Sequence, residues 1–127
     1  MKTLAYIAIF AIAGALARYG QMLLVGGIAG HAFPWSILSI NVFGSFVMGF
    51  LFFETIERIA IDPELRTGLL TGFLGAYTTF STFTLGTLKL IEIGAIGRGL
   101  LYSLGSIVLG LFAVMAGAHL SRRRSGG

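Results

Sequence analysis

Polar side chains crowd one short stretch of an otherwise apolar sequence. Between Gly75 and Gly86 the chain reads GAYTTFSTFTLG, in which hydroxyl residues surround Phe80 and Phe83. Hydroxyls donate and accept hydrogen bonds, and an aromatic ring presents an electropositive edge. Such groups could replace part of the hydration shell of a small anion, since the two phenylalanines share one face of a helix. The alternative is that both rings face lipid or packing partners.

The same stretch indicates a break in its helix. The apolar window over residues 65–90 is longer than the roughly 20 residues that one membrane crossing requires. A break near its centre would free the carbonyl groups from Gly75 to Thr78 to bind a cation, while amide ends could face an anion. The alternative is an unbroken helix, in which the Ser and Thr hydroxyls bond to carbonyls of the preceding turn.

Other polar groups lie within apolar sequence. The Asn41 amide offers N–H donors, which suit an anion; a hydrogen-bonded clasp between helices is the alternative. Tyr102 and Ser106 share a helix face, which forms either a polar track or an interfacial anchor beside close packing. The charge of Arg18 either faces a water-filled vestibule that concentrates anions or snorkels to the membrane interface.

Transmembrane helices must position these residues. The chain has 127 residues, of which 56% are hydrophobic and 11% are charged, a composition typical of membrane proteins. We therefore expect an all-α integral membrane protein with a single four-helix domain over residues 1–127, in which the third helix is either broken or continuous. The closing residues 125–127 could be a tail left by cloning. The predicted helices cover approximately residues 4–24, 33–53, 65–90 and 99–120.

The distribution of charge bears on partners and orientation. The net charge is +4, and the arginines at 122–124 supply most of the excess at a helix end, which favours lipid headgroups over nucleic acid. Apart from this cluster, the two membrane sides carry three basic residues each, counting Arg18. Such balance is expected of a protein that inserts in both orientations, whereas the arginine cluster alone could hold the termini in the cytoplasm. Four thin helices cannot easily enclose a polar path by themselves, so we expect an oligomer, most simply a dimer.

The sequence TGFLGAYTTFSTF, the asparagine of SINVFGSFVMGF and the arginine of GALARYG together resemble the Fluc (CrcB) family of small fluoride channels. The chain length and the four apolar windows extend this resemblance over essentially the whole chain. It implies that the third helix is broken near its centre, at residues 75–79. It also implies a dual-topology, antiparallel homodimer in the bacterial inner membrane, with two pores and a structural Na⁺ at its centre. The implied function is passive export of cytoplasmic fluoride down its electrochemical gradient, which gives fluoride resistance.

The resemblance also implies roles for individual residues. The carbonyls of Gly75 and Thr78 from both subunits would hold the Na⁺, and Arg18 would lie in the vestibule. Gly86 departs from the family, which frequently has Glu there, so no proton-carrying or gating carboxylate is expected at this position. The implied fluoride path consists of Asn41, Phe80, Phe83, Ser81, Thr82, Tyr102 and Ser106.

Other functions fit the sequence less well. A small proton-coupled exporter needs a titratable carboxylate within a span, whereas all five carboxylates here lie near window ends or in loops. A non-transporting assembly subunit would use Asn41 and the hydroxyls only as packing contacts and would conduct no ion. An enzyme is the least supported class, because no Cys is present and no His or carboxylate pair occupies a plausible shared site.

Overall fold

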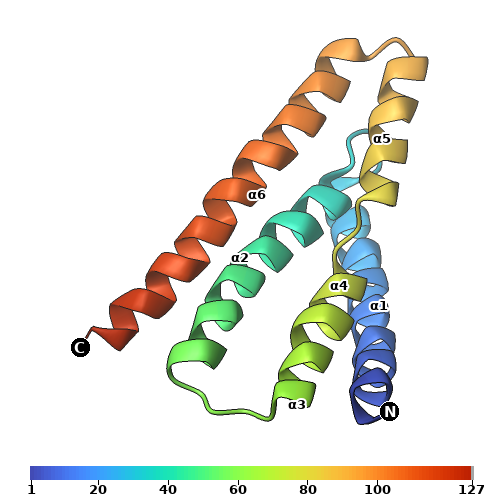
Figure 1. Ribbon diagram of the computed structural model, residues 1–127. Coiled ribbons are helices and arrows are strands. Elements are labelled where there is room, and N and C mark those ends of the chain that lie inside the picture. Colours follow the sequence, from blue (N-terminus) through green and yellow to red (C-terminus); the bar gives the residue numbers. More distant parts are fainter. Residues whose placement is uncertain (127) are drawn as a thin grey trace.

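Three long, continuous helices form most of the computed structural model, which describes residues 1–126 (Figure 1). They are α1 (Lys2–Ala29), α2 (Trp35–Glu57) and α6 (Ile96–Ser125), and each is long and apolar enough to cross a membrane. The last residue of the predicted tail, Gly127, lies outside the described residues. Of the other two tail residues, Ser125 is the last residue of α6 and Gly126 caps that helix.

The remaining crossing, third along the chain, is divided into short segments. Thr78 has φ −79° and ψ 160°, an extended conformation that no helix interior adopts, and the helix resumes only at Ser81. The predicted break in the third apolar window is therefore present, and the unbroken-helix alternative is wrong. The segments are α3 (Pro63–Thr67), the π-helix η1 (Gly68–Leu74), α4 (Gly75–Tyr77) and α5 (Ser81–Glu92).

The observed helices extend beyond the C-terminal ends of their predicted windows. The first helix passes its predicted end at residue 24 and continues to Ala29, and the second and last helices also extend further. No proline stops α1 earlier, and it ends where Gly30 adopts φ 76°, a left-handed conformation that glycine enters without steric cost. The predicted C-terminal ends of these three helices were therefore about one turn too early, whereas α2 begins at Trp35, inside its predicted window.

Glycines let the backbones of α2 and α6 approach closely along their shared length (Figure 1). A Cβ atom on Gly49 would collide with the carbonyl oxygen of Val114, and one on Gly117 would collide with that of Phe46. In lipid, where the hydrophobic effect does not drive helices together, such small residues allow the packing that does. The predicted packing role of glycine is confirmed here.

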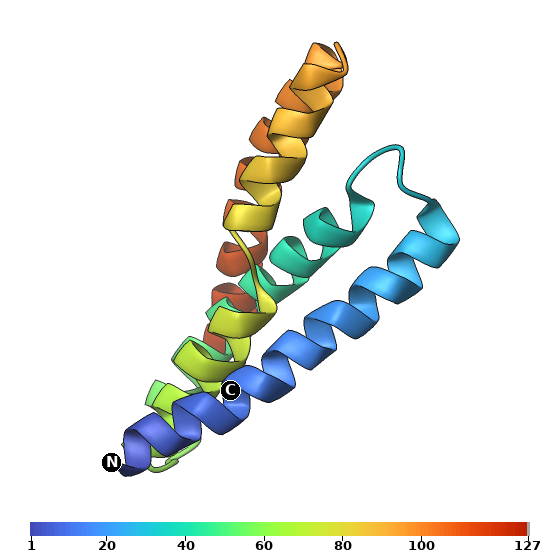
Figure 2. The same ribbon diagram turned by 90° about the vertical axis from the view of Figure 1, so that its right-hand side faces the viewer.

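The first helix packs on the π-helix in the same manner. A Cβ atom on Gly72 would lie 2.7 Å from the carbonyl oxygen of Ile7, and one on Gly68 would lie 2.8 Å from Cβ of Tyr6. Figure 2 shows that α5 and the adjoining part of α6 lean away from the α1–α2 hairpin. The break in the third crossing thus lies where the two halves of the molecule diverge.

Candidate functional site

The side chain of Asn41, on α2, replaces the backbone bonds that the break removes. Its Nδ2 donates to the carbonyl of Thr79 at 2.9 Å, and its Oδ1 accepts the Thr79 N–H at 2.9 Å. In an unbroken helix this N–H would donate to the carbonyl of Gly75. The clasp proposed as the alternative role for Asn41 is therefore observed, and one Asn41 amide hydrogen is left for another acceptor.

The guanidinium group of Arg18 contacts the same break. Its Nη1 donates to the carbonyl of Thr78 at 3.3 Å, and the side chain is half-buried. Arg18 is thus attached to the break by this hydrogen bond. Because a carbonyl oxygen accepts two hydrogen bonds, the Thr78 carbonyl keeps one free acceptor position. The vestibule role of Arg18 stays a prediction.

A hydrogen-bonded chain that the sequence reasoning missed holds the residue before the break. The hydroxyl of Tyr77 donates to Oε1 of Gln21, and Nε2 of Gln21 donates to Oγ of Ser39 at 3.2 Å. Tyr77 thereby connects α1, α2 and α4. The signal in the sequence was Gln21 itself, an uncharged amide inside the first apolar window, where a polar group requires a partner.

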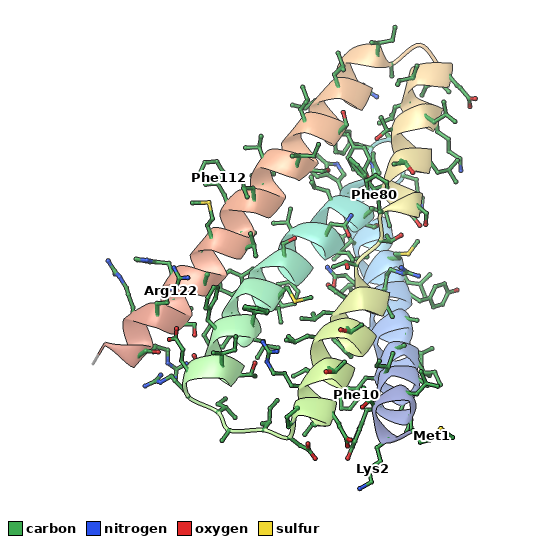
Figure 3. The ribbon with its side chains drawn as sticks, viewed as in Figure 1. Met1, Lys2, Phe10, Phe80, Phe112 and Arg122 are labelled. Atoms are coloured by element: carbon green, nitrogen blue, oxygen red, sulfur yellow. The ribbon has the colours of Figure 1, made fainter. Side chains whose placement is uncertain are left out.

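A cavity of about 610 Å³ opens between α2, the break and α6. It is mostly apolar, and four of the predicted path residues contribute to its wall. Phe80, which lies beside the break in Figure 3, is 77% exposed, and its ring centroid is 5.9 Å from that of Phe83. The four residues are Asn41, Phe80, Phe83 and Ser106.

Two hydroxyls beside this cavity are buried without a partner. Tyr102 is 1% exposed, and its ring lies between those of Phe83 and Phe33, with centroid distances of 5.2 Å and 5.6 Å. Within the part of the chain that the structure describes, neither the Tyr102 hydroxyl nor that of Ser106 forms a hydrogen bond. A buried polar group left unpaired costs about 1–3 kcal/mol. Both hydroxyls are therefore available to a ligand or to water.

A second cavity, of about 310 Å³, lies between the α1–α2 turn and α5. Thr82 and Gly86 line it, whereas the exposed Ser81 lines neither cavity. Phe83 lines the first cavity, and a Cβ atom on Gly86 would lie 3.4 Å from the Tyr102 ring. The two cavities share no lining residue, and Tyr102, which lines neither, contacts Phe83 of the first. The structure divides the predicted path into two chambers, which the sequence did not indicate.

The family model described as "CrcB-like protein, Camphor Resistance (CrcB)" matches residues 5–118 of this chain. The chain belongs to this family. The resemblance expected from the sequence is confirmed by a match that includes the break, the Asn41 clasp and both cavities. Together with three helices of spanning length, family membership shows a multi-pass bacterial membrane protein.

Similar proteins cover nearly the whole length of this family member. A protein of Acidithiobacillus ferrooxidans named "Fluoride-specific ion channel FluC" is 61% identical over 119 residues, 94% of this chain and 95% of the relative. A protein of the same name from Hahella chejuensis is 44% identical, over 94% of each chain. Another, from Thermus thermophilus, is 44% identical over 84% of this chain and 85% of its own.

Proposed function

We propose that this CrcB family member is a passive ion channel that is selective for fluoride and exports it from the bacterial cytoplasm across the inner membrane. It is not an enzyme. The observation that carries the proposal is the pair of buried, unpaired hydroxyls, Tyr102 and Ser106, beside a cavity that Asn41 and two phenylalanines line. The names of the similar proteins identify fluoride as the ion to test.

The proposed path exchanges water for protein donors in steps. In the first cavity an ion meets the unused N–H of Asn41 and the Ser106 hydroxyl, then the edges of the Phe80 and Phe83 rings. Beyond the Phe83–Tyr102 contact, the tyrosine hydroxyl and that of Thr82 are the next donors. A narrow constriction with individually weak sites admits fluoride, excludes the larger chloride and still permits exit.

An antiparallel homodimer with two pores would complete this path. In the single subunit the first cavity is open on one side, and Phe80 is 77% exposed. Gly75 is also exposed, and a Cβ atom there would meet no other atom within 4 Å. A second copy that covers this face by two-fold symmetry would enclose two equivalent paths, with Ser81 and Phe80 available to the partner. The balanced charge of the two membrane sides supports insertion in both orientations.

The carbonyls of Gly75 and Thr78 fit the Na⁺ that the family resemblance implies. Backbone oxygens are the ligands that hard cations prefer, and Thr79 has given up its helical bond to Gly75 in favour of Asn41. Thr78 retains one acceptor position beside Arg18. When bound, Na⁺ would supply positive charge that holds the carbonyls of two breaks together. The neighbouring guanidinium group of Arg18 would limit the site to a monovalent cation.

The alternative functions differ in whether they need a carboxylate along the path and in whether they predict any ion flux. No carboxylate lines either cavity, and the buried Glu54 bonds to Ser121 at the end of α2, so no residue is placed to couple protons to transport. A non-transporting assembly subunit remains the main alternative. It would use the same contacts for packing alone, and it predicts that the purified protein conducts nothing.

Fluoride efflux from proteoliposomes tests the proposal. Purified protein should release fluoride rapidly, as measured with a fluoride electrode, and release no chloride, once a potassium ionophore prevents charge build-up. Phe83→Ile, and likewise Phe80→Ile, should lower the rate by about tenfold or more, since 1.4 kcal/mol of lost stabilisation is a factor of ten. Both variants should still assemble as dimers.

Phe112→Ile is the matched control for these variants, because Phe112 is 64% exposed on α6 and lines neither cavity (Figure 3). It should conduct like the unaltered protein. Silence of a folded wild-type dimer would favour the assembly subunit over the channel. Unchanged flux in both Phe80→Ile and Phe83→Ile would remove the phenylalanines from the path.

A further inference from the structure

The half-buried side chain of Gln21, on α1, uses both ends of its amide. The Tyr77 hydroxyl donates to its Oε1, and its Nε2 donates to Oγ of Ser39 at 3.2 Å. The Ser39 hydroxyl in turn donates to the carbonyl of Ser36 at 2.8 Å. An amide turned the other way would need a proton from Ser39, whose single hydroxyl proton is already used. The orientation of the Gln21 amide is therefore fixed, with its oxygen toward Tyr77.

The Tyr77 ring is held by apolar contacts everywhere except at its hydroxyl. It is 5% exposed, it stacks on Phe73 with the ring centroids 6.2 Å apart, and it meets Phe43 edge-on at 6.4 Å. A Cβ atom on Gly44 would lie 3.2 Å from Cδ1 and Cε1 of the same ring. Because apolar contacts are not directional, they allow the ring to slide. The bond to Gln21 is the contact that fixes how far Tyr77 reaches between α1 and α2.

A movement of Tyr77 is passed directly to the break. Tyr77 is the last residue of α4, and the extended Thr78 follows it. Next come Thr79, whose backbone pairs with Asn41, and Phe80, whose exposed ring lines the first cavity. Since each peptide group is planar, only two soft rotations per residue separate these groups from Tyr77. The position of Tyr77 therefore affects where they lie along the proposed path.

We propose that Gln21 is a positioning residue for ion selectivity. Through the Tyr77 hydroxyl it holds the break where Asn41 and Phe80 accommodate fluoride and exclude the larger chloride. Neither Gln21 nor Tyr77 lines either cavity, so neither contacts the ion along the proposed path. The inference deepens the proposed channel function and rests on it, since selectivity requires a conducting path.

Loss of the Gln21 amide would leave the Tyr77 hydroxyl without its partner. An unpaired hydroxyl in an apolar site is costly, so the ring should move until water or another acceptor satisfies it. The break would move with the ring, and the constriction would either widen for chloride or lose donors to fluoride. Both changes lower the preference for fluoride. Ser39 stays satisfied in such a variant, because its proton goes to the Ser36 carbonyl.

The reversal potential of Gln21→Leu in planar bilayers, measured between fluoride and chloride solutions, tests this role. This potential reports the ratio of the two permeabilities and does not depend on how many channels have folded. A merely structural loss would therefore leave it unchanged. In Gln21→Leu the ratio should fall about tenfold, the effect of one lost buried hydrogen bond. The reversal potential should shift by about 59 mV toward that of an unselective channel.

Tyr77→Phe, added to Gln21→Leu, tests whether the effect passes through the tyrosine. The double variant has no unpaired hydroxyl, and its phenyl ring keeps the packing against Phe73 and Phe43. Removal of both partners of a buried hydrogen bond is nearly neutral, so the selectivity should return toward that of the wild type. The matched control is Tyr19→Phe, because Tyr19 is 59% exposed on α1. Added to Gln21→Leu, this control should restore nothing.

Gln21→Asn covers the case in which Gln21→Leu does not assemble. Its amide is one methylene shorter, so the bond to Tyr77 is lost or draws the ring toward α1, and the permeability ratio should fall in either case. A wild-type reversal potential in the folded variants at position 21 would overturn the positioning role. A double variant as unselective as Gln21→Leu would exclude the route through Tyr77. A silent wild type would contradict the channel function itself, and this inference with it.

Discussion

At the scale of single residues, the side-chain amide of Asn41 forms the hydrogen bonds that a backbone peptide group would otherwise form. Its amide pairs with both the N–H and the carbonyl of Thr79, as a neighbouring turn of helix would. Within a bilayer no water satisfies a broken helix, so an irregular segment persists only where protein groups or a water-filled cavity complete its hydrogen bonds. Asn41 thus makes the break possible, in addition to facing the first cavity.

Asn41→Leu should therefore destabilise the fold as well as stop conduction. The change leaves two backbone groups of Thr79 unpaired, which should cost about 2–6 kcal/mol in total, at 1–3 kcal/mol for each group. Thermal unfolding in detergent measures this loss of stability, with the disappearance of the dimer peak in size-exclusion chromatography as the signal. Ser45→Ala is the control, because its hydroxyl bonds only to the Asn41 carbonyl of its own helix, at 2.7 Å. A leucine variant as stable as the wild type would contradict the clasp.

The residue types in the sequence indicated some of the contacts at the break but gave no sign of others. Asn41 and the two phenylalanines stood out because polar or clustered aromatic side chains are unusual inside apolar sequence. The bond from Arg18 to Thr78 was not foreseen, since it joins positions 60 residues apart. The pairing of Gln21 with Tyr77 was missed for the same reason. Only the packing of α1 against the broken segment brings these partners together.

At the scale of elements, the third crossing differs most from a simple helix. Its length and its β-branched residues left a break and an unbroken helix both open, the family resemblance implied the break, and the extended Thr78 confirms it. The π-helix η1 just before it was not predicted. Its glycines, Gly68 and Gly72, lie against Tyr6 and Ile7 of α1, a contact that local sequence does not indicate.

The close contact of α2 with α6 should be sensitive to a single side chain. Gly117→Val would force its Cβ into the carbonyl of Phe46 and to within 2.8 Å of the Phe50 amide nitrogen. Overpacking of this kind should cost about 1–3 kcal/mol and lower the melting temperature in detergent. Gly105→Val on the same helix meets no neighbour within 4 Å and should melt like the wild type. Equal melting temperatures for the two variants would contradict this packing.

At the scale of the whole molecule, the single subunit presents an incomplete site. The first cavity is open beside the exposed Phe80, and the exposed Gly75 carbonyl has lost its helical donor. Basic residues are spread evenly over the two membrane sides once the arginines at 122–124 are set aside. These features fit a subunit that inserts both ways and pairs with an inverted copy.

Cysteine labelling tests the two orientations, because the chain contains no cysteine of its own. Ser125→Cys near one end and Glu92→Cys near the other should each react to about half with a membrane-impermeant maleimide applied from one side, since neither orientation is favoured. Both positions are exposed in the subunit. Complete labelling at one position and complete protection at the other would show a single orientation and exclude the antiparallel dimer.

The sequence by itself determined the membrane setting and the helical class, while the interruption in the third crossing was implied by its resemblance to the family. The setting and the class follow from local composition and length, because each helix in lipid must satisfy its own backbone. Only the tertiary structure decided that Asn41 closes the break, that Arg18 holds Thr78 and that Tyr102 contacts Phe83 of the first cavity. Those contacts join residues far apart in the chain, and their geometry depends on where glycines allow the helices to meet.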